Sequence, residues 1–408
     1  MSLAAFLRDD ARWLAAGALL AFASSFGQTF FIAAFAGAWR AEFGLSHGQW
    51  GAIYMAATVT SAAVLTQAGR LADHVPTRRL AFFILCGFAS VALAVSAASA
   101  WWMLLPLVFG LRFCGQGMLS HVAIVSMGKW FRARRARAVA VAALGFSVGE
   151  AVLPAAALAA LGAFGWRAAW LAVAGVLLLV IAPAFLAILR RERIPVSAPG
   201  DAPIPDGMGG RSWTRAEMLR HWLFWAILPG VAGPPWVGTV VFFQTVHLTE
   251  IKGWDPVAYA GLAFPAFSAV SIATSFVAGW AADRWGAVRL LPVYLLGWAA
   301  GAVALSLAES LSGAVLAFAL AGIGTGAVSV VHGAIFAELY GPRWLGGVKA
   351  VAFAVAVLAS ALGPGLSGAM LDGGIGFEAQ LIGMGAFLAL TSLWLLPVSR
   401  RARQELAA

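Results

Sequence analysis

Residues 69–79 read Gly-Arg-Leu-Ala-Asp-His-Val-Pro-Thr-Arg-Arg, and residues 279–289 read Gly-Trp-Ala-Ala-Asp-Arg-Trp-Gly-Ala-Val-Arg. Each stretch follows a long apolar run, and the two agree at an offset of 210 residues. The pairs that agree at this offset include Gly69 with Gly279, Asp73 with Asp283, Arg79 with Arg289 and, further along the chain, Pro154 with Pro364. The sequence therefore consists of two related halves.

The chain is far too apolar for a soluble protein. Of its 408 residues, 62% are hydrophobic and 11% are charged, whereas soluble domains carry about 25% charged residues. This composition excludes a soluble enzyme, a disordered chain and a disulfide scaffold, and it indicates an integral membrane protein. Cys86 and Cys114 lie singly in apolar runs, without a C-x-x-C motif or a ligand cluster. We therefore expect neither a metal nor a cofactor.

Twelve apolar runs are long enough to cross a bilayer, because a hydrocarbon core of about 30 Å requires about 20 helical residues. They cover residues 13–39, 49–68, 80–100, 102–127, 138–162, 168–189, 221–248, 257–279, 289–309, 312–338, 348–370 and 378–398. The runs are rich in Ala and Leu and lack a period of two, which excludes membrane strands. The first run is too long for a signal peptide, so we expect an uncleaved helix. We predict an all-α membrane protein with twelve transmembrane helices in two pseudo-symmetric six-helix bundles.

Basic residues mark one side of the membrane. With the N-terminus in the cytoplasm, 23 of the 27 Lys and Arg residues are cytoplasmic, three lie on the opposite side, and Arg112 lies inside a helix. Cytoplasmic segments of membrane proteins carry an excess of Lys and Arg. We therefore expect a multi-pass protein of the cell (inner) membrane with both termini in the cytoplasm. The same asymmetry explains the net charge of +10, so no nucleic-acid partner is expected.

Residues 190–220 form the longest polar stretch, with four prolines and a glycine-rich patch at 207–210. This composition is typical of a flexible linker. We predict an N-terminal six-helix bundle over residues 1–189, a cytoplasmic linker over 190–220 and a C-terminal six-helix bundle over 221–408. Parallel six-helix repeats are an architecture of transporters, in which the substrate site lies near the midplane.

The stretch 69–79, called the gate loop below, resembles the signature that members of the major facilitator superfamily carry between helices 2 and 3. The resemblance implies that this loop latches the cytoplasmic gate. It assigns Gly69 to a close helix approach, Asp73 to a charge contact near the start of the eleventh helix, and Arg78 and Arg79 to contacts across the loop. Gly279, Asp283 and Arg289 are the equivalents in the second half. A solvated charged turn is the alternative interpretation.

Three further segments resemble one branch of this superfamily, the monocarboxylate porters and oxalate/formate antiporters. They are Lys-Trp-Phe-Arg-Ala-Arg-Arg at 129–135, Gly-Phe-Ser-Val-Gly at 145–149 and Gly-Trp-Arg at 165–167. The resemblance implies transport of small carboxylates with protons or by exchange. Where many members carry a Lys in the first helix, this chain has Gln28, and its eighth run has no ionisable residue.

Ionisable groups at membrane depth are costly and therefore functional candidates. Arg112 lies about ten residues inside the fourth run and Glu150 about twelve inside the antiparallel fifth, which puts both at a similar depth. We predict an Arg112–Glu150 pair. One interpretation is a switch in which protonation of Glu150 frees Arg112 to bind an anion; the other is a static ion pair.

Four more polar residues in the apolar runs are candidates for the substrate and proton pathway. His121 and His332 occupy nearly equivalent places in the two halves, and a His can carry a proton in the physiological range. Gln28 and Gln244 are uncharged hydrogen-bonding residues in the first helix of each half. With Arg112 and Glu150 they form our predicted substrate and proton pathway. A neutral His bonded to a neighbouring helix, and amides that join helices, are the alternatives.

Glycines and prolines predict bending within helices. Pro234 and Pro235 predict that the seventh helix is interrupted or kinked, because proline removes a backbone donor. The predicted hinge residues are Gly145, Gly149, Pro154, Pro234, Pro235 and Pro364. Close packing of small residues between helices is the competing interpretation.

These observations together predict a secondary transporter that works by alternating access. We expect symport of a small organic anion, a monocarboxylate, with protons, by a monomer in the lipid bilayer. The alternatives are a proton-driven antiporter that exports drug-like molecules, a uniporter, and a membrane protein that only senses or binds a partner. No enzyme is expected, because the G-x-S-x-G pattern at 145–149 requires a strand-to-helix turn and lies within an apolar helix here.

Overall fold

The computed structural model of the protein describes residues 3–131, 134–193 and 207–407. The middle of the predicted linker, residues 194–206, lies outside the described residues, as do Arg132 and Ala133. The chain divides into two compact units, Met1–Asp201 and Ala202–Ala408. Within the described residues both units are helical, and the bridge between Gly207 and Arg211 is the one isolated strand-like pair.

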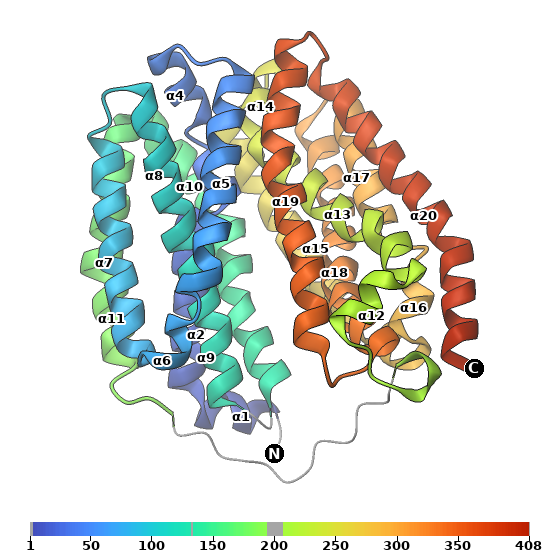
Figure 1. The fold of residues 1–408 in the computed structure, drawn as a ribbon. Coiled ribbons are helices and arrows are strands. Elements are labelled where there is room, and N and C mark those ends of the chain that lie inside the picture. The colour runs from blue at the N-terminus through green and yellow to red at the C-terminus, as the bar shows by residue number, and fades with distance from the viewer. Residues whose placement is uncertain (1–2, 132–133, 194–206, 408) are drawn as a thin grey trace. The chain divides into compact units, whose positions relative to one another are not determined.

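The first unit is coloured blue to green in Figure 1. It covers the first six predicted runs. Its elements are α1 (Leu3–Asp9), α2 (Ala11–Ser24), η1 (Ser25–Gly27), α3 (Thr29–Ala33), α4 (Ala36–Phe43), α5 (His47–Ala68), α6 (Leu71–His74), α7 (Thr77–Ser96), η2 (Trp101–Met103), α8 (Leu104–Leu111), η3 (Arg112–Leu119), α9 (Ser120–Trp130), α10 (Arg135–Gly175), η4 (Val176–Ile181) and α11 (Ala182–Ile188).

The second unit is coloured yellow-green to red in Figure 1. It covers the other six predicted runs. Its elements are η5 (Met208–Gly210), α12 (Arg215–Arg220), α13 (Trp222–Phe243), α14 (Thr245–Lys252), α15 (Pro256–Trp285), α16 (Ala287–Leu290), α17 (Leu296–Leu307), α18 (Leu311–Tyr340), α19 (Leu345–Asp372) and α20 (Phe377–Ala407).

Nine helices of the described residues are long and apolar enough to cross a membrane. The longest spans Arg137–Ile188 and contains two of the predicted runs, which Gly165 separates with a φ of 77°. The remaining two runs correspond to α5, which is not among these nine, and to the shorter apolar helix α17. The predicted all-α fold of two six-helix bundles is therefore confirmed.

Each unit packs its helices in the same order. In the first unit α2 packs against α10, α5 against α8 and η3, and α7 against η4 and α11. In the second unit α13 packs against α19, α15 against α18, and α17 against α20. These are the first helix with the fifth, the second with the fourth, and the third with the sixth. The internal repeat of the sequence is thus a repeat of packing.

The first membrane helix is broken near its middle. After α2, residues Ser25–Gly27 form a 3₁₀ turn, and Gln28 is extended with φ −81° and ψ 160° before α3 begins. A Cβ on Gly27 would lie 2.3 Å from the carbonyl oxygen of Leu111 and 2.8 Å from Cα of Gly115. The fourth helix therefore supports the break by direct backbone contact, and there its segment η3 is a π-helix.

The seventh membrane helix differs from our prediction. α13 stays helical from Trp222 to Phe243 through its three prolines and ends at Gln244, where φ is −92° and ψ is 13°. Pro234 leaves the carbonyl of Gly230 without its helical donor. That carbonyl faces His332 of α18 instead. The predicted interruption is therefore wrong, because a neighbouring helix supplies the missing partner.

Residues 207–220, the end of the predicted linker, are folded against the second unit. The backbone N–H of Trp213 donates to the carbonyl of Tyr340 at 2.8 Å. Thr214 and Glu217 form a capping box at the start of α12. Hydrogen bonds from the backbone and hydroxyl of Thr214 and from Arg211 lower the pKa of Glu217 to about 2. This part of the linker is therefore ordered.

Candidate functional site

A buried arginine lies beside the break in the first membrane helix. Arg112 begins η3 and is 2% exposed. Its Nη1 donates to the carbonyl of Gly27 at 3.3 Å and to Oγ1 of Thr29 at 3.3 Å. The carbonyl of Gly27 is available because Phe31, its expected helical donor, donates to Gln28 instead. The guanidinium therefore stabilises the broken backbone.

Two hydroxyl side chains complete the surroundings of this guanidinium. The centre of the Tyr54 ring lies 5.1 Å from Cζ of Arg112, within cation–π range. The Tyr54 hydroxyl and Oγ1 of Thr29 are 2.7 Å apart and share a hydrogen bond. Arg112, Thr29 and Tyr54 come from the fourth, first and second membrane helices. We call these three residues the arginine site.

One edge of Arg112 has no partner in the described part of the chain. Both hydrogen bonds of its side chain use Nη1, and the buried Nε has no acceptor. The Nε–Nη2 edge of a guanidinium matches the two oxygens of a carboxylate. The Nε–Nη2 edge is therefore the part of the arginine site whose donor geometry suits a planar anion.

The predicted Arg112–Glu150 pair is wrong. The contacts of Arg112 are those with Gly27, Thr29 and Tyr54. Glu150 is half-buried in α10, beside Gly149, which faces Ser25. Similar depth does not fix the direction of a side chain around its helix, and the π-helical turns of η3 change that direction.

The sequence did not identify Thr29 and Tyr54 as part of the site. A signal was present, because the chain has only four tyrosines and Tyr54 lies inside the predicted membrane helix 49–68. Thr29 follows the half-buried Gln28, whose backbone forms the break. Short hydroxyl residues are common in membrane helices, so this signal has little weight by itself.

Within the first unit, the gate loop forms hydrogen bonds and an ion pair with the fourth membrane helix. Nε2 of His121 lies 3.1 Å from the carbonyl oxygen of Gly69. Nζ of Lys129 contacts the carbonyl of Ala72 and lies 3.2 Å from a carboxylate oxygen of Asp73. His121 is therefore a contact of the gate loop, and Asp73 has a cation partner that the resemblance did not predict.

The other residues of the gate loop are more exposed. The side chains of Arg78 and Arg79 face solvent, and the backbone N–H of Arg78 donates to Glu192 at 2.9 Å. A Cβ on Gly69 would meet the Leu65 carbonyl at 2.9 Å and His121 at 3.3 Å. Gly69 is therefore crowded by Leu65 and by the His121 side chain, and the close helix approach that the resemblance assigns to it stays a prediction.

The equivalent loop of the second unit is built differently. Among the described residues of the second unit, nothing lies within 4 Å of a Cβ on Gly279. Asp283 and Arg289 are exposed. A carboxylate oxygen of Glu338, near the end of α18, accepts from the N–H of Ala287 at 2.6 Å. The loop thus has the same place in both halves. In the first unit it contacts Lys129, whereas in the second it contacts Glu338.

Gln244 belongs to a buried amide and hydroxyl network. Its Nε2 donates to Oγ of Ser367 at 3.2 Å, and Ser367 donates to Gln380 at 2.7 Å. Gln380 also donates to the carbonyls of Ser367 and Ile375. Because these groups satisfy one another, the network joins three helices. This geometry favours the interhelical alternative for Gln244.

His332 lies beside Tyr294 in the second unit. Their ring centres are 5.6 Å apart, and the phenol oxygen of Tyr294 lies 2.4 Å from the Cβ position of Gly230. The buried Nε2 of His332 and the hydroxyl of Tyr294 have no hydrogen-bond partner among the described residues. His332 can therefore accept or donate one further hydrogen bond.

The predicted hinge glycines are close-packed in the first unit. A Cβ on Gly145 would lie 2.1 Å from the carbonyl oxygen of Ala18, and one on Gly149 would lie 2.2 Å from Oγ of Ser25. Pro154 lies inside α10, and the buried Pro364 lies inside α19. Pro234 and Pro235 lie inside α13. Bending at these residues stays a prediction, whereas close packing of both glycines is directly observed.

The Gly-Trp-Arg segment forms an ion pair at the start of the sixth helix. Arg167 contacts both carboxylate oxygens of Glu42 at 2.6 and 3.0 Å, and Nε1 of Trp166 donates to Glu42 at 2.7 Å. Arg167 also donates to the carbonyl of Ala98 at 2.9 Å. The pKa of Glu42 is lowered chiefly by the hydrogen bond from Arg167 and further by that from Trp166. Burial of the carboxylate opposes this by raising the pKa.

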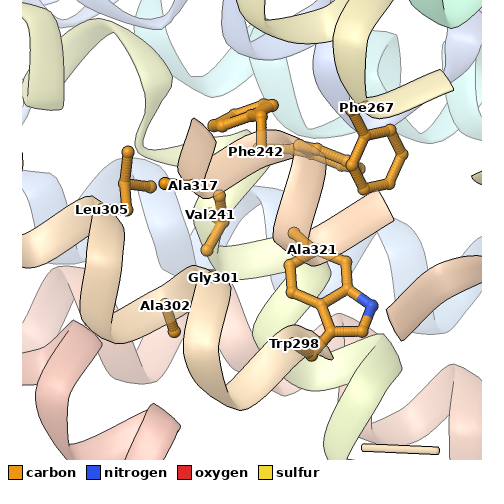
Figure 2. A pocket seen from close by; sticks show the side chains of 10 residues that line it. Val241, Phe242, Phe267, Trp298, Gly301, Ala302, Leu305, Ala317 and Ala321 are labelled. Atoms are coloured by element: carbon orange, nitrogen blue, oxygen red, sulfur yellow. The ribbon is translucent and has the colours of Figure 1, made fainter. Parts of the chain in front are cut away.

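The second unit contains a small apolar cavity. Figure 2 shows Phe242, Phe267 and Trp298 around it. Its volume of about 10 Å³ is about the room of one water molecule. It cannot admit a drug-like molecule in this conformation. The described residues also contain no cluster of three or more His, Cys, Asp or Glu side chains that could hold a metal ion.

Two repeated six-helix bundles, with a buried guanidinium at membrane depth, are the architecture of a membrane transporter. The sequence profile of the Major Facilitator Superfamily matches residues 17–270 and 235–408. The chain belongs to this superfamily, and it is a transporter and not an enzyme.

Three known proteins are similar to this chain. An uncharacterized 38 kDa protein in the 23S RNA operon of Thermoproteus tenax is 27% identical over 321 residues, which are 78% of this chain and 76% of that protein. The crystal structure of a bacterial homologue of the human lysosomal transporter Spinster, inward-facing and unoccupied, aligns with a TM-score of 0.74 and 17% identity over 96% of this chain and 97% of that one.

The nucleoside transporter NupG aligns with a TM-score of 0.63 and 11% identity, over 96% of this chain and 99% of that one. At such identities the two structural likenesses establish the fold alone. None of the three tests the resemblance to the monocarboxylate porters and oxalate/formate antiporters, which stays a prediction.

Proposed function

We propose that the protein is a proton-coupled symporter of small monocarboxylates that works by alternating access. In this proposal the Nε–Nη2 edge of Arg112 binds the substrate carboxylate. The observation that carries the proposal is a buried guanidinium with one edge unpartnered by the described residues and no carboxylate among its contacts. A buried charge of this kind is costly unless an anion neutralises it.

The charge of the site favours a monoanion. Arg112 is the one Lys or Arg of the sequence that lies well inside a membrane helix. A dicarboxylate such as oxalate would bring a second negative charge with no cation at the same depth. Because an unpaired charge at membrane depth is unfavourable, the site selects formate, lactate or pyruvate over oxalate.

Proton coupling follows from the same charge balance. Once the anion neutralises Arg112, a proton moving in the same direction keeps the cycle electrically neutral. Glu150, His121 and His332 are the ionisable residues of the predicted pathway, and Glu150 is half-buried. We assign the proton to Glu150 first. The excess of Lys and Arg on one side supports a location in the inner membrane with both termini in the cytoplasm.

Uptake into proteoliposomes tests the proposal. We expect an inward proton gradient to stimulate uptake of lactate and pyruvate, and Arg112→Ala to abolish it. Glu150→Gln should leave uptake independent of pH, whereas wholly unchanged uptake in this variant would remove Glu150 from the proposal. Absence of uptake of every carboxylate, with and without the gradient, would overturn the substrate class and favour export of drug-like molecules.

A further inference from the structure

Two uncharged residues, Thr29 and Tyr54, hold the guanidinium of Arg112 in position. Thr29 accepts from Nη1 of Arg112 at 3.3 Å, and its hydroxyl shares a 2.7 Å hydrogen bond with Tyr54. The ring of the same tyrosine lies against the guanidinium, with a distance of 5.1 Å from Cζ to the ring centre. Thr29 is 7% exposed, and the Tyr54 side chain is fully buried.

We propose that Thr29 and Tyr54 are positioning residues that determine the affinity for the substrate carboxylate by orienting Arg112. This inference rests on the proposed function, because it assigns a role in binding the same anion. Neither residue is assigned to contact the substrate. Their role is to hold the guanidinium so that its Nε–Nη2 edge stays unpartnered and correctly aimed.

The geometry explains how a hydroxyl pair can do this. Nη1 is fixed by two acceptors, the Gly27 carbonyl and the Thr29 hydroxyl, which lie on either side of the extended Gln28. With both bonds made, the guanidinium cannot rotate in its own plane. The Tyr54 ring restricts movement out of that plane. A carboxylate then meets a preorganised pair of donors and loses less conformational entropy on binding.

The hydrogen bond between Thr29 and Tyr54 makes the orientation of each hydroxyl depend on the other residue. Thr29 alone could rotate about χ1 and point its oxygen away from Arg112. The Tyr54 hydroxyl holds that rotamer, because a buried hydroxyl without a partner is unfavourable. Loss of either hydroxyl should therefore release Nη1 from one of its two acceptors.

Transport kinetics of matched variants test the inference. Thr29→Val removes the hydroxyl and preserves the shape, whereas Thr29→Ser retains the hydroxyl; Tyr54→Phe removes the phenol oxygen and retains the ring. We expect Thr29→Val and Tyr54→Phe to raise KM for pyruvate about tenfold, the effect of one hydrogen bond. kcat should change by less than about twofold, and Thr29→Ser should match wild type. A general loss of structure would not give this split between KM and kcat, nor rescue by serine.

The control is Thr60→Val. Thr60 lies on α5, the helix of Tyr54, and its exposed hydroxyl donates to the Ala56 carbonyl at 2.8 Å. Suppose that Thr29→Val and Tyr54→Phe both keep the wild-type KM, while Arg112→Ala abolishes uptake. This result would overturn the positioning role and leave the proposed function intact. If wild-type protein moves no carboxylate, both fail together. Thermal unfolding of each variant identifies misfolded protein, and the two hydroxyl deletions on separate helices provide independent tests.

Discussion

Gly27 and Gly115 show how single residues determine the site. The Cβ that either glycine lacks would overlap the backbone of the other, at 2.8 Å for Gly27 and 2.6 Å for Gly115. Because both lack it, the broken first helix touches the π-helical segment η3. This contact brings the Gly27 carbonyl within 3.3 Å of Arg112.

Gly27→Ala should therefore separate these two segments. We expect it to destabilise the protein by about 1–3 kcal/mol, as overpacking does, and to abolish carboxylate uptake. Gly87→Ala in α7 is the matched control, since nothing lies within 4 Å of its Cβ position. Thermal unfolding in detergent measures both variants. A Gly27→Ala protein as stable as the Gly87→Ala protein would show that the close approach is not required.

A second prediction at the residue scale concerns pH. The pKa of Glu42 is lowered chiefly by its hydrogen bond to Arg167. A group with a lowered pKa stabilises the fold above its ordinary pKa, and this stabilisation is lost as pH falls through the lowered value. We expect the unfolding temperature of wild type to fall on acidification more than that of Glu42→Gln. Parallel pH profiles for the two proteins would contradict the assignment.

The residues of the site were partly predictable. Arg112 was identifiable from its charge inside an apolar run, because few such residues exist. Its partners were not, since they depend on the direction of each side chain around its helix. The π-helix of η3 and the extended Gln28 change these directions, and neither has a strong local sequence signal.

At the scale of elements, the helices were predicted more reliably than their breaks. The runs at 49–68 and 312–338 correspond closely to α5 and α18. The break in the first helix lacks a proline and arises from packing against the fourth. The seventh helix has three prolines and no break. Tertiary partners for the backbone therefore decide where a membrane helix opens.

Pro234 gives a prediction for the seventh helix. Pro234→Ala removes the ring from the helix interior and supplies an N–H for the Gly230 carbonyl, which already faces His332. Stability should therefore rise by less than the full cost of an interior proline, about 3 kcal/mol. If Pro234 is a hinge, the same change should lower kcat for uptake and leave KM nearly unchanged. Thermal unfolding and initial rates of uptake give the two values. Increased stability with unchanged kcat would exclude the hinge.

At the scale of the whole molecule, the chemistry is less symmetric than the fold. Both units repeat the same helix packing. Among the described residues, a buried arginine beside a broken helix is found in the first unit, whereas the second has the Gln244 network and His332 in the corresponding helices. We infer that the repeat preserves the scaffold and that one half carries the anion site.

The distribution of charge predicts the orientation of the molecule. With 23 of 27 Lys and Arg residues on one side, both termini should lie in the cytoplasm. A C-terminal fluorescent-protein fusion should fluoresce, and a C-terminal alkaline phosphatase fusion, which requires export, should be inactive. Activity of the phosphatase at this terminus would reverse the predicted topology.

The most direct test of the account is the binding of pyruvate and oxalate to purified protein, measured by isothermal titration calorimetry in wild type, Arg112→Lys and Arg112→Ala. Lysine keeps the charge but lacks the two-pronged edge that matches a carboxylate. We predict that wild type binds pyruvate more tightly than oxalate, that Arg112→Lys binds pyruvate about tenfold or more weakly, and that Arg112→Ala does not bind it. Equal pyruvate affinity in all three proteins would contradict the assignment of Arg112 as the anion site.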